Sequence, residues 1–188
     1  MGRTSSPRRG PSTFLPLLVS LAGAVVVVSC AGDSEGSIKT ATVFESPEGR
    51  FRVELPARPE RRQQTETTDG VAITVIAFTA EVGDEAYSVA FSDMPPAVLR
   101  QRPADRLKGV PEGAAARLPG KVRSSRPTTF QGADAVDYVI DGEGKARGSV
   151  AAAKAFLAGS RLYVLQAVSK GGERPFFDRM VASFTLTG

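Results

Sequence analysis

The sequence predicts an α+β domain built on an antiparallel β-sheet of about seven to eight strands. Three features indicate this class. Short runs of alternating or β-branched apolar residues are separated by glycine-containing turns, as in β-hairpins. Residues 97–118 have an interrupted helical spacing, and an amphipathic stretch follows the last apolar run. We therefore expect a broken central helical segment and a C-terminal amphipathic helix packed on the sheet.

The expected strands fall on both sides of the helical segment. Those before it are 51–56, 61–68, 71–82 and 86–93. Those after it are 121–130, 133–141, 146–157 and 161–169. The expected strand at 61–68 is polar throughout, which predicts an edge strand. The last is apolar at both alternating positions, so we expect it at the centre of the sheet with both faces covered.

Prolines and glycines delimit the expected helices. Pro103 is suited to a first helical turn, whereas Gly109 and Pro111 interrupt any continuous helix over 97–118. The C-terminal helix is expected over 173–184. Its apolar residues recur with helical spacing and form one stripe: Phe176, Phe177, Met180, Val181 and Phe184.

Residues 1–29 have the pattern of a secretory signal peptide. Arg3, Arg8 and Arg9 form a basic start, and residues 14–28 are almost wholly apolar. A helix over that stretch is about 22 Å long, which is shorter than the roughly 30 Å hydrocarbon core of a bilayer. We therefore expect a cleaved signal rather than a transmembrane span.

The end of this segment, Val27-Val28-Ser29-Cys30, resembles the lipobox of bacterial lipoprotein precursors. The resemblance implies cleavage before Cys30 and attachment of a diacylglyceryl group to its thiol, and Cys30 is the single cysteine of the chain. Residues 30–40 then form the lipidated cysteine and a flexible tether, and 41–188 form a single extracytoplasmic domain. We expect the protein to be lipid-anchored in the cell envelope on the extracytoplasmic side of a membrane.

Composition excludes several classes of function. The chain has no His and one Cys, so the commonest general base is missing and an intrachain disulfide, a thiolate zinc cluster and an iron–sulfur site are excluded. Residues 32–36 match the G-x-S-x-G motif around Ser34, but a serine nucleophile of that type needs a His base. We expect no catalytic residue, no metal, no cofactor and no enzymatic activity.

Net charge argues against nucleic acid as a partner. The chain has 24 Lys and Arg against 20 Asp and Glu, and three of the basic residues lie in the expected signal peptide. Leaving these three out reduces 24 basic residues to 21 against 20 acidic ones, without the sustained basic stripe that nucleic-acid binding requires.

Several charged groups have both a functional and a structural interpretation. The acidic groups at 134–143 (Asp134, Asp137, Asp141, Glu143) and at 81–85 (Glu81, Asp84, Glu85) lack the spacing of a metal loop, and we interpret them as strand ends and turns. Residues 142–146 are interpreted as a hairpin turn rather than a phosphate loop. Arg58, Arg61 and Arg62 can contact anionic lipid head groups or protect an edge strand, and we favour protection.

Residues 44–56, Phe-Glu-Ser-Pro-Glu-Gly-Arg-Phe-Arg-Val-Glu-Leu-Pro, together with the order of elements, resemble the PsbP-like fold. This fold is shared by photosystem extrinsic subunits and Ran-binding Mog proteins, and uncharacterised bacterial lipoproteins carry similar domains. The resemblance implies an antiparallel sheet between helices and roles in binding, assembly and scaffolding. The interruption at Pro111 departs from a regular version of the fold.

These observations lead to two hypotheses about function. The first is a non-enzymatic, membrane-anchored module that binds or scaffolds another envelope protein. The alternative is a carrier or sensor of an apolar, lipid-like ligand held between the sheet and the stripe of Phe176, Phe177, Met180 and Phe184, although core packing also accounts for that stripe.

Overall fold

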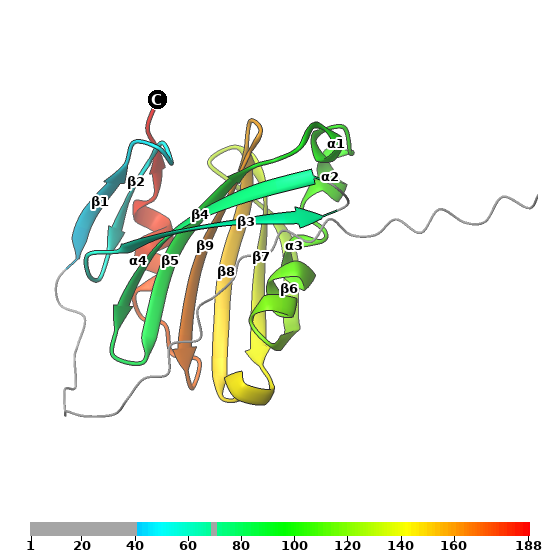
Figure 1. Cartoon of the computed structure of the whole chain (residues 1–188). Coiled ribbons are helices and arrows are strands. Elements are labelled where there is room, and N and C mark those ends of the chain that lie inside the picture. The colour runs from blue at the N-terminus through cyan, green and yellow to red at the C-terminus, as the bar shows by residue number, and fades with distance from the viewer. Residues whose placement is uncertain (1–40, 69–70) are drawn as a thin grey trace, which may run out of the picture.

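The computed structural model describes residues 41–68 and 71–188. These residues form a seven-stranded and a three-stranded sheet, all of whose strand pairs are antiparallel. The large sheet has the order β3-β4-β5-β9-β8-β7-β6 (Figure 1). Its strands are β3 (Glu60–Thr68), β4 (Val71–Val82), β5 (Glu85–Asp93), β6 (Gly120–Phe130), β7 (Ala133–Gly142), β8 (Ser149–Ala158) and β9 (Arg161–Lys170).

The prediction of an antiparallel sheet with helices is confirmed, but the prediction of a single sheet is wrong. The expected strand at 51–56 belongs to a separate small sheet with the order β1-β2-β10. Its strands are β1 (Thr42–Ser46), β2 (Phe51–Leu55) and β10 (Thr185–Leu186). The sequence analysis did not predict β1 or β10, because five and two residues carry too little periodicity.

Two element boundaries also differ from the prediction. Residues 146–148 do not belong to β8, because the chain first forms a 3₁₀ turn at η1 (Gly144–Ala146) and passes through Gly148 at φ +87°. The C-terminal helix α4 spans Phe177–Ser183 and is shorter than expected. Phe184 already has an extended backbone, with ψ 129°, and leads directly into β10.

The interruption of the central helical segment is confirmed. Three short helices replace one continuous helix: α1 (Pro96–Leu99), α2 (Pro103–Arg106) and α3 (Val110–Arg117). Pro103 is the first residue of α2, and Pro111 lies in the first turn of α3, where a missing backbone N–H removes no intrahelical hydrogen bond.

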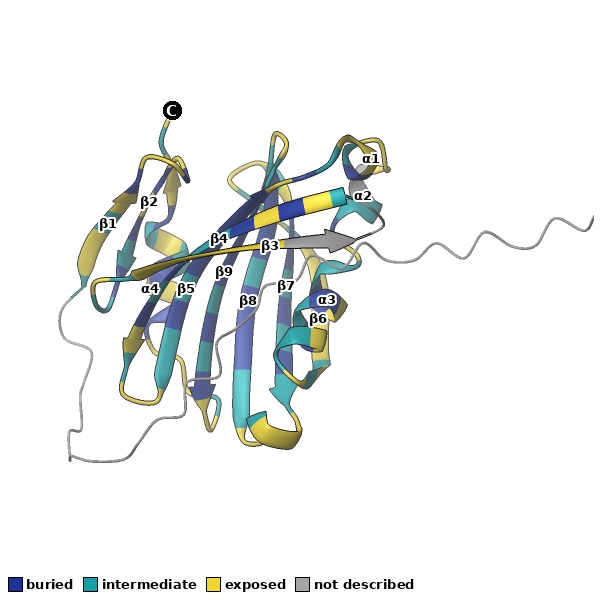
Figure 2. Ribbon diagram, in the orientation of Figure 1, coloured by how far each residue is buried: buried dark blue, intermediate teal, exposed yellow. Residues whose placement is uncertain are grey.

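The large sheet is covered on both sides (Figures 1 and 2). The small sheet and α4 pack on one side, which we call the α4 face, and α1–α3 pack on the other, which we call the α3 face. The central strand β9 contributes Tyr163 and Leu165 to the α4 face and Leu162 and Val164 to the α3 face, all buried. The prediction of a central strand covered on both faces is therefore confirmed. In the described part of the chain, no helix is long and apolar enough to span a bilayer.

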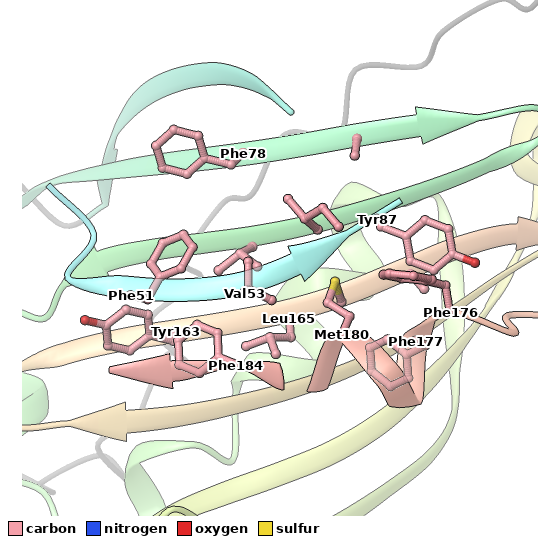
Figure 3. Packing of buried hydrophobic residues seen from close by; sticks show 14 of the residues in the cluster. Phe51, Val53, Phe78, Tyr87, Tyr163, Leu165, Phe176, Phe177, Met180 and Phe184 are labelled. Atoms are coloured by element: carbon pink, nitrogen blue, oxygen red, sulfur yellow. The ribbon is translucent and has the colours of Figure 1, made fainter. Parts of the chain in front are cut away.

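Aromatic rings join the small sheet to the large one. The ring of Phe51 on β2 is fully buried, 5.4 Å from the Phe184 ring centroid and 6.4 Å from that of Tyr163 (Figure 3). Phe51, Val53 and Leu55 alternate with Arg52 and Glu54, so β2 has one apolar face. Because that face lies against the large sheet, the two sheets share one hydrophobic core.

A polar strap also attaches the β1–β2 turn to the large sheet. Tyr163 Oη donates a hydrogen bond to the buried carbonyl of Gly49 at 2.8 Å, and Arg161 Nη1 donates to the carbonyl of Glu48 at 2.8 Å. Arg161 Nε and Nη2 also bind Asp93 at 2.8 and 2.9 Å. This guanidinium holds the pKa of the Asp93 carboxyl below its ordinary value. The segment that carries the sequence resemblance is thus a hairpin fixed at its turn.

Candidate functional site

Two residues considered in the sequence analysis lie outside the described residues. These are Cys30, the expected lipidation site, and Ser34, in the rejected serine motif. Both therefore stay predictions at the level of sequence.

The acidic residues of β7 do not converge. Residues two apart on a strand lie on the same face of the sheet. The exposed Asp134 therefore shares the α3 face with Val136, whereas Asp137 shares the α4 face with Val139. Among the described residues, no group of three or more acidic, His or Cys side chains is arranged to hold a metal ion. Asp137 lies in the middle of β7, so its interpretation as a strand-end residue is wrong. Asp141 is near the end of β7, and Glu143 is in the following turn.

The other acidic group and the glycine-rich turn lie in hairpins, as expected. Asp84 is in the β4–β5 turn and pairs with Lys170 at 3.2 Å. Glu85 accepts a hydrogen bond from the Tyr87 hydroxyl at 2.5 Å, and Glu81 pairs with Ala86 in the strand register. Residues 142–146 run from the last residue of β7 through η1, and Gly142 is required because a Cβ there would lie 2.1 Å from the Ala146 carbonyl oxygen.

Two of the three arginines near β3 pair with carboxylates of the same domain. Arg61 binds Glu48 through two hydrogen bonds of 2.7 and 3.0 Å, and Arg62 pairs with Glu60 at 3.2 Å. Arg58 is exposed between β2 and β3. Because β3 is an outer strand of the large sheet, these contacts favour edge protection for Arg61 and Arg62.

The apolar stripe of the C-terminal segment is part of the core. Phe176, Phe177, Met180 and Phe184 are all buried in the cluster between α4, the small sheet and the large sheet (Figure 3). Phe176 packs edge-on against Tyr87, with ring centroids 5.6 Å apart. Packing within the protein accounts for the apolar character of these residues.

A half-buried arginine and a buried tyrosine lie close together on the α3 face. Burial lowers the pKa of Arg117, at the end of α3, to about 10 and raises the pKa of the neighbouring Tyr138 above its ordinary value. Both groups titrate far from neutral pH. They therefore do not supply a general acid or base for chemistry at pH 7.

Charged side chains gather instead on the α4 face of β6, β7 and β8. Lys154 on β8 donates to Asp137 on β7, and Arg126 on β6 lies 3.6 Å from the same carboxylate. The Lys154 ammonium also lies 5.4 Å from the centre of the Phe130 ring. Arg123 binds Asp141 next to this group, with Nε at 2.9 Å from Oδ2. We call the set Arg123, Arg126, Asp137, Asp141 and Lys154 the ion-paired face.

Coverage of the sheet decreases across this face. The side chain of Lys154 is 13% exposed, that of Asp137 33% and that of Arg126 79%. Exposure thus rises from β8 to the outer strand β6 (Figure 2). The helix α4 packs on β2 and β9, which leaves the outer strands as the less covered part of the α4 face.

Fixed charges on a partly covered sheet face are suited to recognition. The exposed ion pairs of Arg123 and Arg126 contribute only about 0–1 kcal/mol each to folding stability, so these two cations add little to the fold. They can steer and orient a partner of complementary charge. The group contains three cations and two carboxylates, so it favours a partner that presents an acidic group.

The sequence analysis did not single out Lys154. The available signal was its place in the apolar run Val150-Ala-Ala-Ala-Lys-Ala-Phe-Leu157. A lysine in such a strand needs a buried or bridging carboxylate. Its partner Asp137 could not be chosen before the β7–β8 register paired the two residues.

No family model matches the sequence, and no curated protein matches it. Among solved structures, the chain is similar to the solution structure of cyanobacterial PsbP (CyanoP) from Synechocystis sp. PCC 6803, with a TM-score of 0.54 and 14% sequence identity. The match covers 85% of this chain and 98% of CyanoP. The chain has the PsbP-like fold. A crystal structure of a protein of unknown function from Pseudomonas aeruginosa matches with a TM-score of 0.43 and 16% identity, over 73% of this chain and 88% of that protein. The similarity to CyanoP confirms the expected PsbP-like fold.

Proposed function

We propose that this PsbP-like domain is a membrane-anchored, extracytoplasmic binding module that binds or scaffolds another envelope protein and is not an enzyme. In this proposal residues 1–29 are removed, Cys30 is lipidated, and residues 31–40 link the lipid to β1. The partner binds the ion-paired face on the α4 side of β6, β7 and β8.

The bridging carboxylate of Asp137 is the observation that carries the binding proposal. It holds a nearly buried lysine on one side and an exposed arginine on the other. Arg126 is therefore oriented without being covered, and its guanidinium retains donors for a carboxylate of a partner. Arginine is enriched at protein interfaces.

The lipid anchor is tested by metabolic labelling with a fatty acid in the producing bacterium. Wild type should incorporate the label and lose residues 1–29, as measured by intact mass. Cys30→Ala should remain unlabelled. A wild-type protein that keeps its first 29 residues and carries no acyl chain would contradict the anchor.

The binding face is tested by photo-crosslinking in cells, with the reactive amino acid at Ser124 or at Ser125. The two neighbours are both exposed on β6, but Ser124 is in register with Val139, on the α4 face, and Ser125 with Tyr138, on the α3 face. We expect a discrete protein adduct at position 124 and a much weaker one at 125.

Charge reversal provides the matched control for this experiment. Arg126→Glu should abolish the adduct at position 124, because it places a carboxylate where the partner's acidic group binds. Arg147→Glu, in an exposed turn after η1, makes the same charge change and should leave the adduct intact. Equal adducts at both serines, or an adduct that Arg126→Glu leaves unchanged, would contradict this use of the face.

The alternative of an apolar-ligand carrier depended on the stripe along the C-terminal segment. Because those side chains are packed in the core, they do not favour the carrier hypothesis.

A further inference from the structure

A second charged surface lies at the opposite side of the large sheet, around α1 and α2. Between residues 100 and 108 the chain carries four basic residues and one acidic residue. We call the four basic residues Arg100, Arg102, Arg106 and Lys108 the basic cap. Figure 1 shows α1 and α2 at an end of the large sheet that lies away from β1.

Buried side chains and a backbone hydrogen bond attach the segment of the basic cap to the rest of the domain. Val98 in α1 and Leu107 after α2 are buried in the hydrophobic cluster of the α3 face. The backbone of Met94, just before α1, donates to the carbonyl of Ser160 at 2.8 Å. These contacts fix the two short helices against the sheet, so the charges of the cap are held in place rather than carried on a free loop.

The carboxylate of Asp105 binds two cations of the basic cap but does not neutralise the cap as a whole. Asp105 accepts from Arg102 Nε at 2.6 Å and from Lys108 Nζ at 2.5 Å. The side chains of Arg102 and Lys108 are nevertheless 85% and 70% exposed. Arg106 donates to the backbone carbonyl of Gln101 at 3.0 Å, an interaction that leaves its positive charge unbalanced. The segment therefore keeps a surplus of about three positive charges near neutral pH.

Two other basic groups of the domain are more nearly balanced. Arg61 and Arg62 are paired with Glu48 and Glu60 near the edge strand β3. The ion-paired face has two carboxylates for its three cations. The basic cap is thus the more strongly positive of these surfaces, and three of its cations, Arg100, Arg102 and Lys108, are exposed.

We infer that the basic cap docks on anionic phospholipid head groups and so orients the anchored domain on its own membrane. This inference rests on the proposed lipid anchor, since a tether of ten residues reaches at most roughly 35 Å. Within that reach the membrane is the nearest extended anionic surface. With the cap against the head groups, the ion-paired face on the other side of the sheet stays available to a protein partner.

The size of the effect follows from the surplus charge. A lysine or arginine close to an anionic bilayer strengthens binding about fivefold, the equivalent of about 1 kcal/mol. Removing three such charges should therefore lower the ratio of docked to undocked protein by about 100-fold. High salt should act similarly, because the screening length falls from about 10 Å at 0.1 M to about 3 Å at 1 M.

The test uses the chain from Cys30 onward, since both hydrophobic clusters consist of residues from position 41 onward. Cys30, the single thiol, is coupled to a maleimide phospholipid in nanodiscs of phosphatidylcholine, with or without phosphatidylglycerol. A head-group spin label then broadens the NMR signals of the backbone amides that lie near the lipid surface. We expect broadening centred on residues 99–108 with phosphatidylglycerol, and its loss in 1 M salt.

Two triple variants distinguish the effect of the charges of the basic cap from the effect of the net charge of the domain. Arg100→Gln, Arg102→Gln and Lys108→Gln together should remove the broadening at the cap. The control Arg52→Gln, Arg58→Gln and Lys145→Gln makes the same change in net charge at exposed positions elsewhere and should retain it. Retention in the cap variant, or equal loss in both variants, would overturn the inference.

Other outcomes would also decide against membrane docking. Equal broadening on phosphatidylcholine alone would show that anionic lipid is not recognised. Shifts at the cap produced by free inorganic phosphate, with no broadening on anionic nanodiscs, would indicate a soluble anion as ligand. Absence of both effects in a folded protein would leave a protein partner as the occupant of the cap. Because the linkage is synthetic, none of these results bears on natural lipidation or on the ion-paired face, which have separate tests.

Discussion

Replacing Phe51 by alanine tests whether the small sheet is an integral part of the domain. Phe51 is fully buried and surrounded by the rings of Phe44, Phe78, Phe91, Tyr163 and Phe184, with centroid distances of 5.4 to 6.5 Å. Buried Phe→Ala substitutions cost about 3–5 kcal/mol. The ring also loses edge-on aromatic contacts, which adds to the cost of the lost burial. We therefore expect a loss of about 4 kcal/mol in the free energy of unfolding.

The measurement is urea unfolding of the chain from Ala31, followed by circular dichroism. For a domain of this size each kcal/mol of lost stability lowers Tm by about 2–4 °C. Thermal unfolding of the same variant should therefore show a decrease in Tm of about 12 °C. The matched control is Val43→Ala on the neighbouring strand β1, where the side chain is half exposed, and it should change stability by less than about 0.5 kcal/mol. A loss below about 1.5 kcal/mol for Phe51→Ala, or similar losses for both variants, would refute the packing of the two sheets around this ring.

Three further predictions concern the strap between the sheets. Gly49→Ala should destabilise by about 1–3 kcal/mol in thermal unfolding, because its Cβ would lie 2.5 Å from the Phe51 ring; an unchanged Tm would contradict this. Tyr163→Phe should cost about 1–2 kcal/mol in urea, since the buried Gly49 carbonyl loses its hydroxyl donor; a neutral effect would show that the bond is dispensable. Arg161 lowers the pKa of Asp93, so this carboxylate stabilises the fold above its ordinary pKa of 3.8 and the contribution is lost as pH falls through the lower folded value. Asp93→Asn should therefore show a shallower loss of stability below about pH 4, and an acid profile identical to wild type would count against the pairing.

Much of the fold was predictable because its signals are local. Alternation of apolar residues located β4 and β5, and the turns at Gly83 and Gly132 follow from glycines with positive φ. The interruption at Pro111 follows from the missing N–H of proline. The candidate site was less predictable, since Asp137 was interpreted as a strand-end residue and Lys154 was not considered.

The sequence by itself determined the segments of β2 and of the seven strands of the large sheet, where the helical segment breaks, and which chemistry is missing from a chain without His. These properties depend on the period of apolar residues, on proline and glycine, and on composition, all of which act within a few residues. Only the tertiary structure decided that β2 pairs with β10 near the C-terminus rather than joining the large sheet. It alone placed Lys154 opposite Asp137. The first pairing joins segments that are distant in the chain, and the second depends on the register between neighbouring strands whose connection contains η1. Both are selected by burial of shared faces, which no local pattern contains.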